Sequence, residues 1–299
     1  MVDLYYFIFK NFLIMAARKH SITFLLLTLF IVYSCKNVAQ YKSPAGYDIN
    51  KPEKFIMNQA LHEISGITFI EGKKDTIFAI EDEKGKLFSI ALGNTNLSHS
   101  KFAKKGDFED VSVLNNNTVS VLRSDGSLFL FPVAEIGKEK IDSLHEYDNI
   151  LPEGEYEGLA GEDGKLYALC KNCLTDNEKT EVSVYTMSQD SGKILTVSGS
   201  FKIDLSFIKP EDIKGKGKGK FHPSGLAKNP VTHEWFIISS VNKLLLVLGE
   251  QWKVKEYYRL DPIIFKQPEG ITFNRKGDLY ISNEGGEGDA NILLFRYQK

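Results

Sequence analysis

The chain has 299 residues, of which 42% are hydrophobic, and its 37 Lys and Arg against 39 Asp and Glu leave a formal net charge of −2. This length and apolar content suffice for one large core. The even charge balance excludes the basic face that nucleic-acid binding needs, so nucleic acid is not an expected partner.

The first 35 residues have the pattern of an export signal. Arg18-Lys19-His20 precedes the apolar stretch Ile22–Tyr33, which ends at Ser34-Cys35. A basic region, a short apolar region and a small residue make a secretory signal. Val32-Tyr33-Ser34-Cys35 resembles a relaxed lipobox, in which the Cys35 thiol carries the lipid. The alternative is a single membrane-spanning anchor, because Val2–Ala17 is also apolar.

Both interpretations place the rest of the chain outside the cytoplasm and tether it to a membrane. We expect a linker over residues 36–52, of which Lys36–Tyr47 separates the lipid from the domain. The sequence after Cys35 lacks the acidic residue of a surface-export signal. We therefore expect a monomeric lipoprotein of the cell envelope that faces the periplasm.

A short phrase recurs five times in residues 53–299. In each copy a small or acidic residue is followed by Gly or Asp and then by an apolar run. The copies are Ile64-Ser65-Gly66-Ile67, Phe108-Glu109-Asp110-Val111, Tyr156-Glu157-Gly158-Leu159, Pro223-Ser224-Gly225-Leu226 and Pro268-Glu269-Gly270-Ile271. Repeats of about 40–50 residues with several strands each are typical of β-propeller blades.

The spacing between the copies predicts five blades. Successive copies lie 44, 48, 67 and 45 residues apart, counted at the Gly or Asp. The long interval contains Lys214–Lys220, an alternation of Lys and Gly that we interpret as a solvated loop insertion. A six-bladed propeller is the alternative, if that interval hides a degenerate blade.

Two further strands are expected after each phrase. The second strands are Thr76–Ile80, Thr118–Leu122, Lys165–Leu169, Glu234–Ile238 and Asp278–Ser282. The third strands are Leu87–Ala91, Leu128–Val133, Val182–Met187, Leu244–Leu248 and Ile292–Tyr297. The predicted outer strands are Lys101–Ala103, Ser198–Ile203 and Lys253–Leu260. The chain ends after the third strand of the last blade, so we predict that Glu53–Gln59 supplies its outer strand and closes the ring. Closure removes exposed sheet edges.

Equivalent positions of the blades meet around the axis of a propeller. The phrases therefore predict a ring of Ser65, Glu109, Glu157, Ser224 and Glu269. Three carboxylates in a narrow channel repel one another unless their pKa values rise, basic partners lie close, or a cation binds. Calcium accepts oxygen ligands of this kind, so Glu109, Glu157 and Glu269 are candidate calcium ligands. The alternative is that these glutamates accept backbone N–H groups between blades and only fix the blade angle.

The ends of the second strands supply the other candidate ligand-binding residues. Together with the ring serines and a histidine, the set is Ser65, Glu81, Asp82, Arg123, Lys171, His222, Ser224, Ser239, Asn283 and Glu284. Arg123 and Lys171 are candidate basic partners of the ring carboxylates. Glu81, Asp82 and Glu284 are candidates to activate water with a metal. His222 has a structural alternative, as a hydrogen-bonding residue of the rim.

Cys170 and Cys173 remain once Cys35 is assigned to the lipid. No second pair completes a zinc site, and a thioredoxin-like context is missing. A local disulfide in an oxidising compartment and two unpaired structural cysteines both stay open.

Three segments resemble the SdiA-regulated protein family, exported propellers grouped near the phytase-like and NHL propellers. They are Tyr156–Ala160, Pro223–Ala227 and Gln267–Ile271 with Gly277–Glu284, and the resemblance extends over Phe55–Tyr297. It implies no reaction, but similar propellers hold calcium at the central channel. Family members often carry acidic residues at the ends of several second strands, whereas here only the first and last blades do.

These observations lead to two functional hypotheses. The first is a membrane-tethered propeller that binds a small-molecule or protein ligand on its central face, with a calcium ion. The second is a metal-assisted hydrolase of phosphoesters or lactones that uses the same carboxylates. Whether the protein is an enzyme stays open at this stage.

Overall fold

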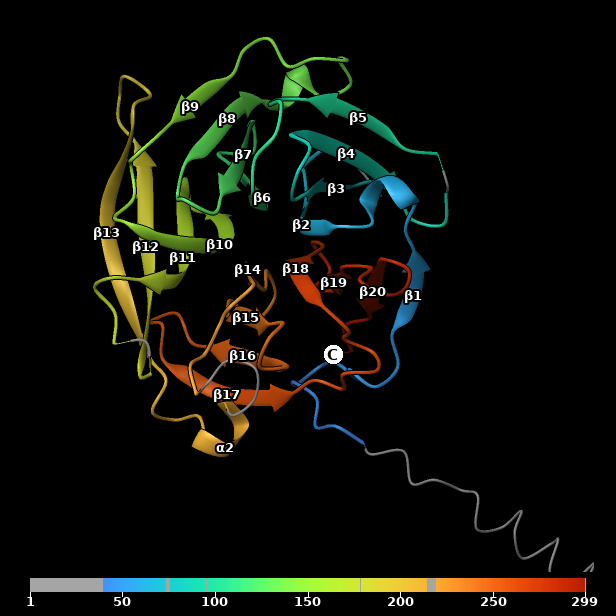
Figure 1. Cartoon of the computed structure of the whole chain (residues 1–299), viewed down its shortest axis with the longest axis vertical. Coiled ribbons are helices and arrows are strands. Elements are labelled where there is room, and N and C mark those ends of the chain that lie inside the picture. The colour runs from blue at the N-terminus through green and yellow to red at the C-terminus, as the bar shows by residue number, and fades with distance from the viewer. Residues whose placement is uncertain (1–39, 74–75, 95, 178, 214–218, 299) are drawn as a thin grey trace, which may run out of the picture. The chain divides into compact units, whose positions relative to one another are not determined.

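Five four-stranded antiparallel sheets surround a common axis in the computed structural model (Figure 1). The structure describes residues 40–73, 76–94, 96–177, 179–213 and 219–298. The predicted signal, Cys35 and most of the Lys-Gly insertion lie outside these residues. No helix of the described part of the chain is long and apolar enough to cross a membrane.

Each sheet is one blade, and strand order follows chain order from the axis outward. Blade 1 contains β2 (Ile64–Phe69), β3 (Thr76–Glu81), β4 (Lys86–Ala91) and β5 (Ser98–Lys101). Blade 2 contains β6 (Phe108–Leu114), β7 (Thr118–Arg123), β8 (Leu128–Pro132) and β9 (His145–Tyr147). Blade 3 contains β10 (Gly154–Glu162), β11 (Lys165–Cys173), β12 (Glu181–Gln189) and β13 (Leu195–Asp204). Blade 4 contains β14 (Gly225–Lys228), β15 (Trp235–Ser239), β16 (Leu244–Leu248) and β17 (Val254–Arg259).

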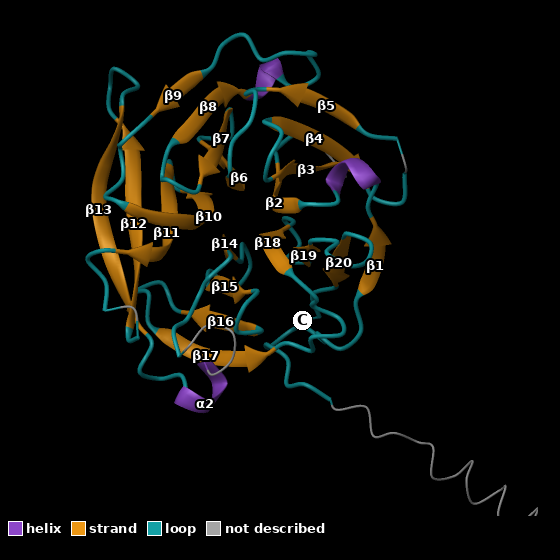
Figure 2. Ribbon diagram, viewed as in Figure 1, coloured by secondary structure: helices purple, strands orange, loops and turns teal. Residues whose placement is uncertain are grey.

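The last blade closes the ring with the first strand of the chain. β18 (Pro268–Phe273), β19 (Leu279–Asn283) and β20 (Asn291–Phe295) are followed at the outer edge by β1 (Glu53–Ile56). β1 pairs antiparallel with β20, and Phe55 lies opposite Ile292. The predicted closure is therefore confirmed. Figure 2 shows β1 at the periphery of this blade, beside blade 1.

Five blades, and not six, account for the described residues. The 67-residue interval is filled by the long strands of blade 3 and by the short helix α2 (Pro210–Ile213). The other helical turns are η1 (Gln59–Leu61) and η2 (Val133–Glu135). The predicted outer strand at Lys101–Ala103 lies earlier, at Ser98–Lys101, because the N–H groups of Phe102 and Ala103 both donate to the Gly85 carbonyl and not along a strand ladder.

The core lies between neighbouring blades, because each sheet is packed on both faces. Five apolar clusters fill the five blade junctions. All five residues of β16 are buried, as expected for a strand with apolar neighbours on both sides. Across the junction of blades 4 and 5, Phe236 and Phe273 pack edge to face with their ring centroids 5.1 Å apart. Such packing fixes the angle between blades and so the geometry at the axis.

Part of the expected linker belongs to the core. Tyr41–Lys299 forms one compact unit, and Tyr47 and Ile49 are buried in the cluster between blades 4 and 5. The Tyr47 hydroxyl donates to the Gly277 carbonyl at 2.6 Å and accepts from the Asn229 amide at 2.8 Å. The segment before β1 is therefore held against blades 4 and 5.

Candidate functional site

A cavity of about 570 Å³ lies at one end of the axis, and we call it the central pocket. Residues from all five blades line it. They are Ser65, Asp82, Asp107, Glu109, Glu157, Lys171, His222, Pro223, Ser224, Ser240, Val241, Lys243, Lys266, Gln267, Glu269 and Glu284. The five ring residues predicted from the repeat are all among them. The structure therefore brings Ser65, Glu109, Glu157, Ser224 and Glu269 together.

The repeated phrase lies at the start of each inner strand and, in four blades, at an irregularity in the strand pairing. The register between the first two strands shifts between Ile64 and Ile67, and again around Glu109, around Glu157 and between Pro268 and Ile271. A bulged residue has no partner on the neighbouring strand and its side chain is re-aimed. The bulges thus explain why these side chains point into the pocket and do not follow the in-and-out alternation of the rest of the strand.

The buried Glu157 and the partly exposed Lys171 form an ion pair at the wall of the pocket. The Lys171 Nζ donates to Glu157 Oε1, and Glu157 is 7% exposed. Burial raises the pKa of Glu157, against the lowering effect of Lys171 and of a hydrogen bond with Glu109. Burial also raises the pKa of Glu109, and the negative charge of Glu157 adds to the rise. The two carboxyl groups therefore both have raised pKa values, and both lie in the pocket that Lys171 lines.

Glu269 lies across the pocket without an ion pair to any described residue. Burial, followed by the charges of Glu157 and Glu284, raises the pKa of Glu269 to about 8. Burial and Glu63 raise the pKa of Glu284 as well, whose carboxylate accepts from the Gln267 amide. Burial and the neighbouring carboxylates thus favour the protonated form of both side chains on this side of the pocket.

The two ring serines have structural contacts between blades. The Ser224 hydroxyl donates to the Pro268 carbonyl of blade 5 at 2.7 Å, and the Ser65 carbonyl accepts from the Ser282 hydroxyl at 2.8 Å. His222 lines the pocket, and its carbonyl accepts from the Ser239 hydroxyl at 2.5 Å. These residues shape the rim through the backbone.

Contacts between blades also involve the residue that follows Glu109. Asp110 is buried, its Oδ1 accepts from its neighbour Val111 N at 2.8 Å, and its Oδ2 accepts from Leu159 N of blade 3 at 2.6 Å. The alternative hypothesis was that a carboxylate of the ring accepts a backbone N–H group of the next blade and so fixes the angle between the two blades. Here that carboxylate is Asp110, while Glu109 faces the pocket.

Four of the candidate ligand-binding residues do not line the pocket. Arg123 forms ion pairs with Asp125, Glu146 and Asp148 and lies over the Phe129 ring. Ser239 is buried beside Asn242. Asn283 is buried and donates to Asn291 Oδ1 at 3.1 Å. Glu81 is buried behind Asp82 and pairs with Lys84 through Oε2 at 3.1 Å.

Sequence reasoning missed several residues of this region. Asp107, Lys243, Lys266 and Gln267 line the pocket, and Glu63 lies beside Glu81 and Asp82. All of them except Lys243 lie one or two residues before a copy of the phrase. Including the two residues before each copy of the phrase would have found these residues.

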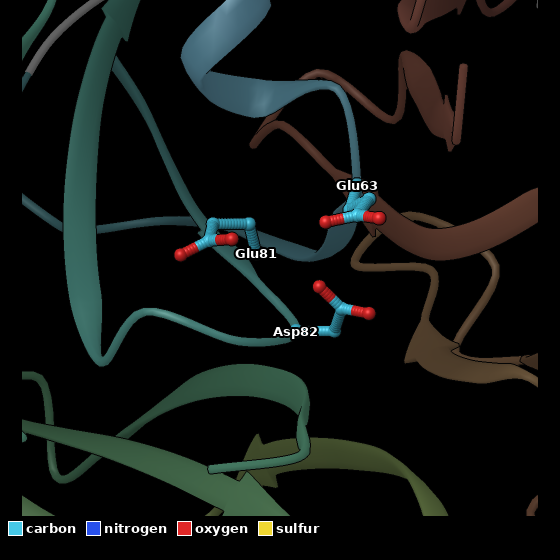
Figure 3. Close-up of side chains that lie close together, drawn as sticks. All are labelled: Glu63, Glu81 and Asp82. Atoms are coloured by element: carbon cyan, nitrogen blue, oxygen red, sulfur yellow. The ribbon is translucent and has the colours of Figure 1, made fainter. Parts of the chain in front are cut away.

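One group of carboxylates in the described part of the chain is spaced to hold a metal ion. Glu63, Glu81 and Asp82 each offer an oxygen within 4.8 Å of the other two. Figure 3 shows the three side chains around one space between the loop that precedes β2 and the end of β3. Asp82 also lines the central pocket. Glu109, Glu157 and Glu269 do not form such a group within the described residues.

The ordered set of repeat phrases and the closed five-bladed ring agree with the family that matches the sequence. The SdiA-regulated family matches residues 42–286. The chain belongs to this family. No curated protein matches the sequence.

Solved propellers resemble this SdiA-regulated protein in fold alone. The PQQ-bound aldose sugar dehydrogenase of Streptomyces coelicolor has a TM-score of 0.52 at 13% identity, covering 86% of this chain and 100% of that one. Virginiamycin B lyase of Staphylococcus aureus has a TM-score of 0.42 at 11% identity, covering 77% and 67%. The luciferin-regenerating enzyme has a TM-score of 0.45 at 11% identity, covering 82% and 95%.

Cys170 and Cys173 form a disulfide at the end of β11. This outcome corresponds to the first of the two possibilities left open by the sequence. Lys171 lies within the short loop that the disulfide closes, so the bond also restricts the backbone that carries the pocket lysine.

Proposed function

We propose that this protein is an exported, membrane-tethered propeller that binds a positively charged ligand in its central pocket, with calcium as the first candidate ion. The observation that carries the proposal is the charge of the pocket wall. Six carboxylate residues line it, Asp82, Asp107, Glu109, Glu157, Glu269 and Glu284, against the three lysines Lys171, Lys243 and Lys266.

The acidic residues of the wall outnumber its lysines by two to one, so the wall carries an excess of acidic groups. Lys171 forms an ion pair with Glu157. Glu109 and Glu269 form no ion pair with a described residue. A cation that enters the pocket gains the attraction of these carboxylates and permits them to ionise. The cavity volume falls in the range that accommodates a small molecule.

The test is calorimetric titration of the full chain in detergent, first with calcium chloride and then with the organic cation spermidine. We expect binding of one of the two, weakened in Glu269→Gln. Glu250→Gln, which removes an exposed carboxylate outside the pocket, should bind as the wild type does. Absence of binding by both probes, or equal affinity in Glu269→Gln and wild type, would contradict the proposal.

Export and tethering rest on the N-terminal pattern and agree with the disulfide. Disulfides persist in oxidising compartments, and Cys170 and Cys173 form one. Cys35→Ala should remove the lipid and release the protein from the membrane fraction. Membrane association that survives in Cys35→Ala would favour the membrane-spanning anchor instead.

A metal-assisted hydrolase is the second candidate, favoured by the three lysines in the same pocket as the carboxylates. Lysine ammonium groups can hold a phosphate while a metal activates water. Turnover of phosphoester or lactone substrates with added calcium, lost in Glu269→Gln, would support this candidate. Binding without turnover would leave the binding function alone.

A further inference from the structure

The carboxylates of Glu63, Glu81 and Asp82, which we call the closure cluster, lie where the ring is joined. Glu63 follows η1 and directly precedes β2, while Glu81 is the last residue of the neighbouring strand β3 and Asp82 follows it (Figure 3). The Asp82 N–H donates to the Glu63 carbonyl at 3.3 Å. The backbone therefore holds two of the three carboxylates on adjacent chain segments.

Two oxygens of the closure cluster are buried and have no hydrogen-bond partner. Glu81 is 1% exposed, and its Oε1 is unpartnered, while its Oε2 accepts from Lys84. Asp82 Oδ1 is likewise buried without a partner. A buried carboxylate oxygen without a donor costs free energy, so such atoms need an explanation. Asp110, one blade away, shows that this fold supplies backbone donors where a carboxylate is structural.

Negative charge around Asp82 is concentrated. Burial, and then the charges of Glu63, Glu81, Glu284 and Glu83, raise the pKa of Asp82 to about 6. Within the described residues, the ion pair of this cluster is the one between Lys84 and Glu81. Four further carboxylates thus act on Asp82, while Lys84 pairs with Oε2 of Glu81.

We propose that the closure cluster is a second cation site, which takes calcium, separate from the central pocket carboxylates Glu109, Glu157 and Glu269. Calcium binds carboxylate oxygens at about 2.3–2.6 Å, so two ligand atoms across the ion lie about 5 Å apart. The mutual distances of up to 4.8 Å in the closure cluster match this spacing. Three carboxylates, each able to bind through one or two oxygens, leave room for water ligands.

The position of the site gives the ion a structural role in ring closure. The chain passes from β1 through η1 to Glu63, and the His62 carbonyl accepts from Gly285 N of blade 5 at 2.8 Å. The His62 ring lies 3.2 Å from the Gly288 carbonyl. An ion between Glu63, Glu81 and Asp82 therefore ties the closing segment to blade 1, next to its contact with blade 5. It would also fix Asp82 at the wall of the central pocket.

The test compares the full chain in detergent with two variants, each by calcium titration and by thermal melting with calcium or with chelator. Asp82→Asn keeps the shape of the side chain and removes one ligand charge, and Glu81→Gln does the same at the buried position. Glu83→Gln is the matched control, because Glu83 is exposed, lies next in sequence, is not in the cluster and has the smallest effect of the four carboxylates on the pKa of Asp82.

We expect the calcium affinity of Asp82→Asn and Glu81→Gln to fall at least about tenfold, since changes around a metal commonly cost 10–100-fold. Without calcium, Asp82→Asn should melt higher than wild type, because it removes repulsion, and the melting rise with calcium should be lost. Glu83→Gln should retain both. If Asp82 were only a structural residue, Asp82→Asn would not melt higher than wild type without calcium and also lose the rise in melting temperature with calcium.

The closure site is overturned if wild type binds no calcium, or if Asp82→Asn and Glu81→Gln bind it as Glu83→Gln does. Glu269→Gln separates the two proposals. A loss of binding in the closure variants alone supports the closure site and counts against calcium in the central pocket, and a loss in Glu269→Gln alone has the opposite meaning. Magnesium titration serves as the second probe, and preference for it over calcium would overturn the choice of ion.

Discussion

Asp110 of blade 2 is buried and Asp82 of blade 1 is partly buried, and the two aspartates near the axis differ in the hydrogen bonds that their oxygens accept. Both oxygens of Asp110 accept backbone N–H groups, one of them from Leu159 on the next blade. Asp82 Oδ1 has no partner. Where blades meet closely, the neighbouring strand satisfies a carboxylate. Where the chain turns away, as at Asp82, a carboxylate oxygen is left without a donor, and this is where we propose that a cation binds.

The close contact between blades 1 and 2 at Gly66 tests the structural side of this comparison. A Cβ on Gly66 would lie 2.2 Å from Asp110 Oδ1 and 2.5 Å from its Cα. Gly66→Ala should therefore push blades 1 and 2 apart and cost about 3 kcal/mol or more in the free energy of unfolding. Chemical denaturation of Gly66→Ala and wild type measures this difference in the free energy of unfolding. Gly192→Ala, where the nearest atom is 3.3 Å away on an exposed turn, should cost less than about 1 kcal/mol.

Removal of the Asp110 carboxylate tests whether it is structural. Asp110→Ala leaves the buried Leu159 N–H without its acceptor, so the free energy of unfolding should fall by about 2–3 kcal/mol. Asp289→Ala, at an exposed position, is the control in the same denaturation experiment. Equal stability of the two variants would show that the hydrogen bonds across the blade contact are dispensable.

Because their pKa values are raised, the pocket carboxyl groups should make the folded protein less stable as pH rises. A carboxylate in an ordinary ion pair has the opposite effect. The pKa of Glu269 is raised to about 8 and that of Asp82 to about 6 by burial and by like charges. Between about pH 5 and 8 the folded protein therefore binds more protons than the unfolded chain, and its stability falls as pH rises. The melting temperature should drop by several degrees over this range.

Glu269→Gln should flatten the upper part of that profile, from about pH 6 to 8, while Glu250→Gln should follow the wild type. Added calcium should reduce the slope in the wild type, since a cation stabilises the ionised carboxylates. Parallel profiles for Glu269→Gln and wild type would mean that Glu269 does not titrate in this range.

The smallest effect is expected at Arg123, which sequence reasoning placed near the ligand. Its guanidinium pairs with Asp125, Glu146 and Asp148 on one blade and lies 5.3 Å from the Phe129 ring centroid. Arg123→Ala should cost about 1 kcal/mol in stability, because exposed ion pairs contribute little. Cation binding by the pocket should be unchanged. Weakened binding would place Arg123 in the functional surface after all.

Most of the fold could be predicted from the local sequence. Alternating apolar strands, the five phrases and their spacing predicted five blades, and the unmatched segment before Ser65 predicted the closing strand, because a ring of four-stranded sheets leaves one edge for it. The sequence also brought Glu109, Glu157 and Glu269 to the axis, since equivalent positions of a repeat must meet there.

The tertiary structure decided which carboxylates are satisfied. The sequence placed Asp110 in the repeated phrase and Asp82 at the end of a second strand, but it did not show that Leu159 N of the next blade holds Asp110 while Asp82 Oδ1 has no donor. Likewise, only the folded chain shows that Lys171 meets Glu157 while Arg123 turns to acidic residues of its own blade. Hydrogen-bond donors and counter-charges come from segments far apart in sequence, and their distances are set by how closely two blades pack.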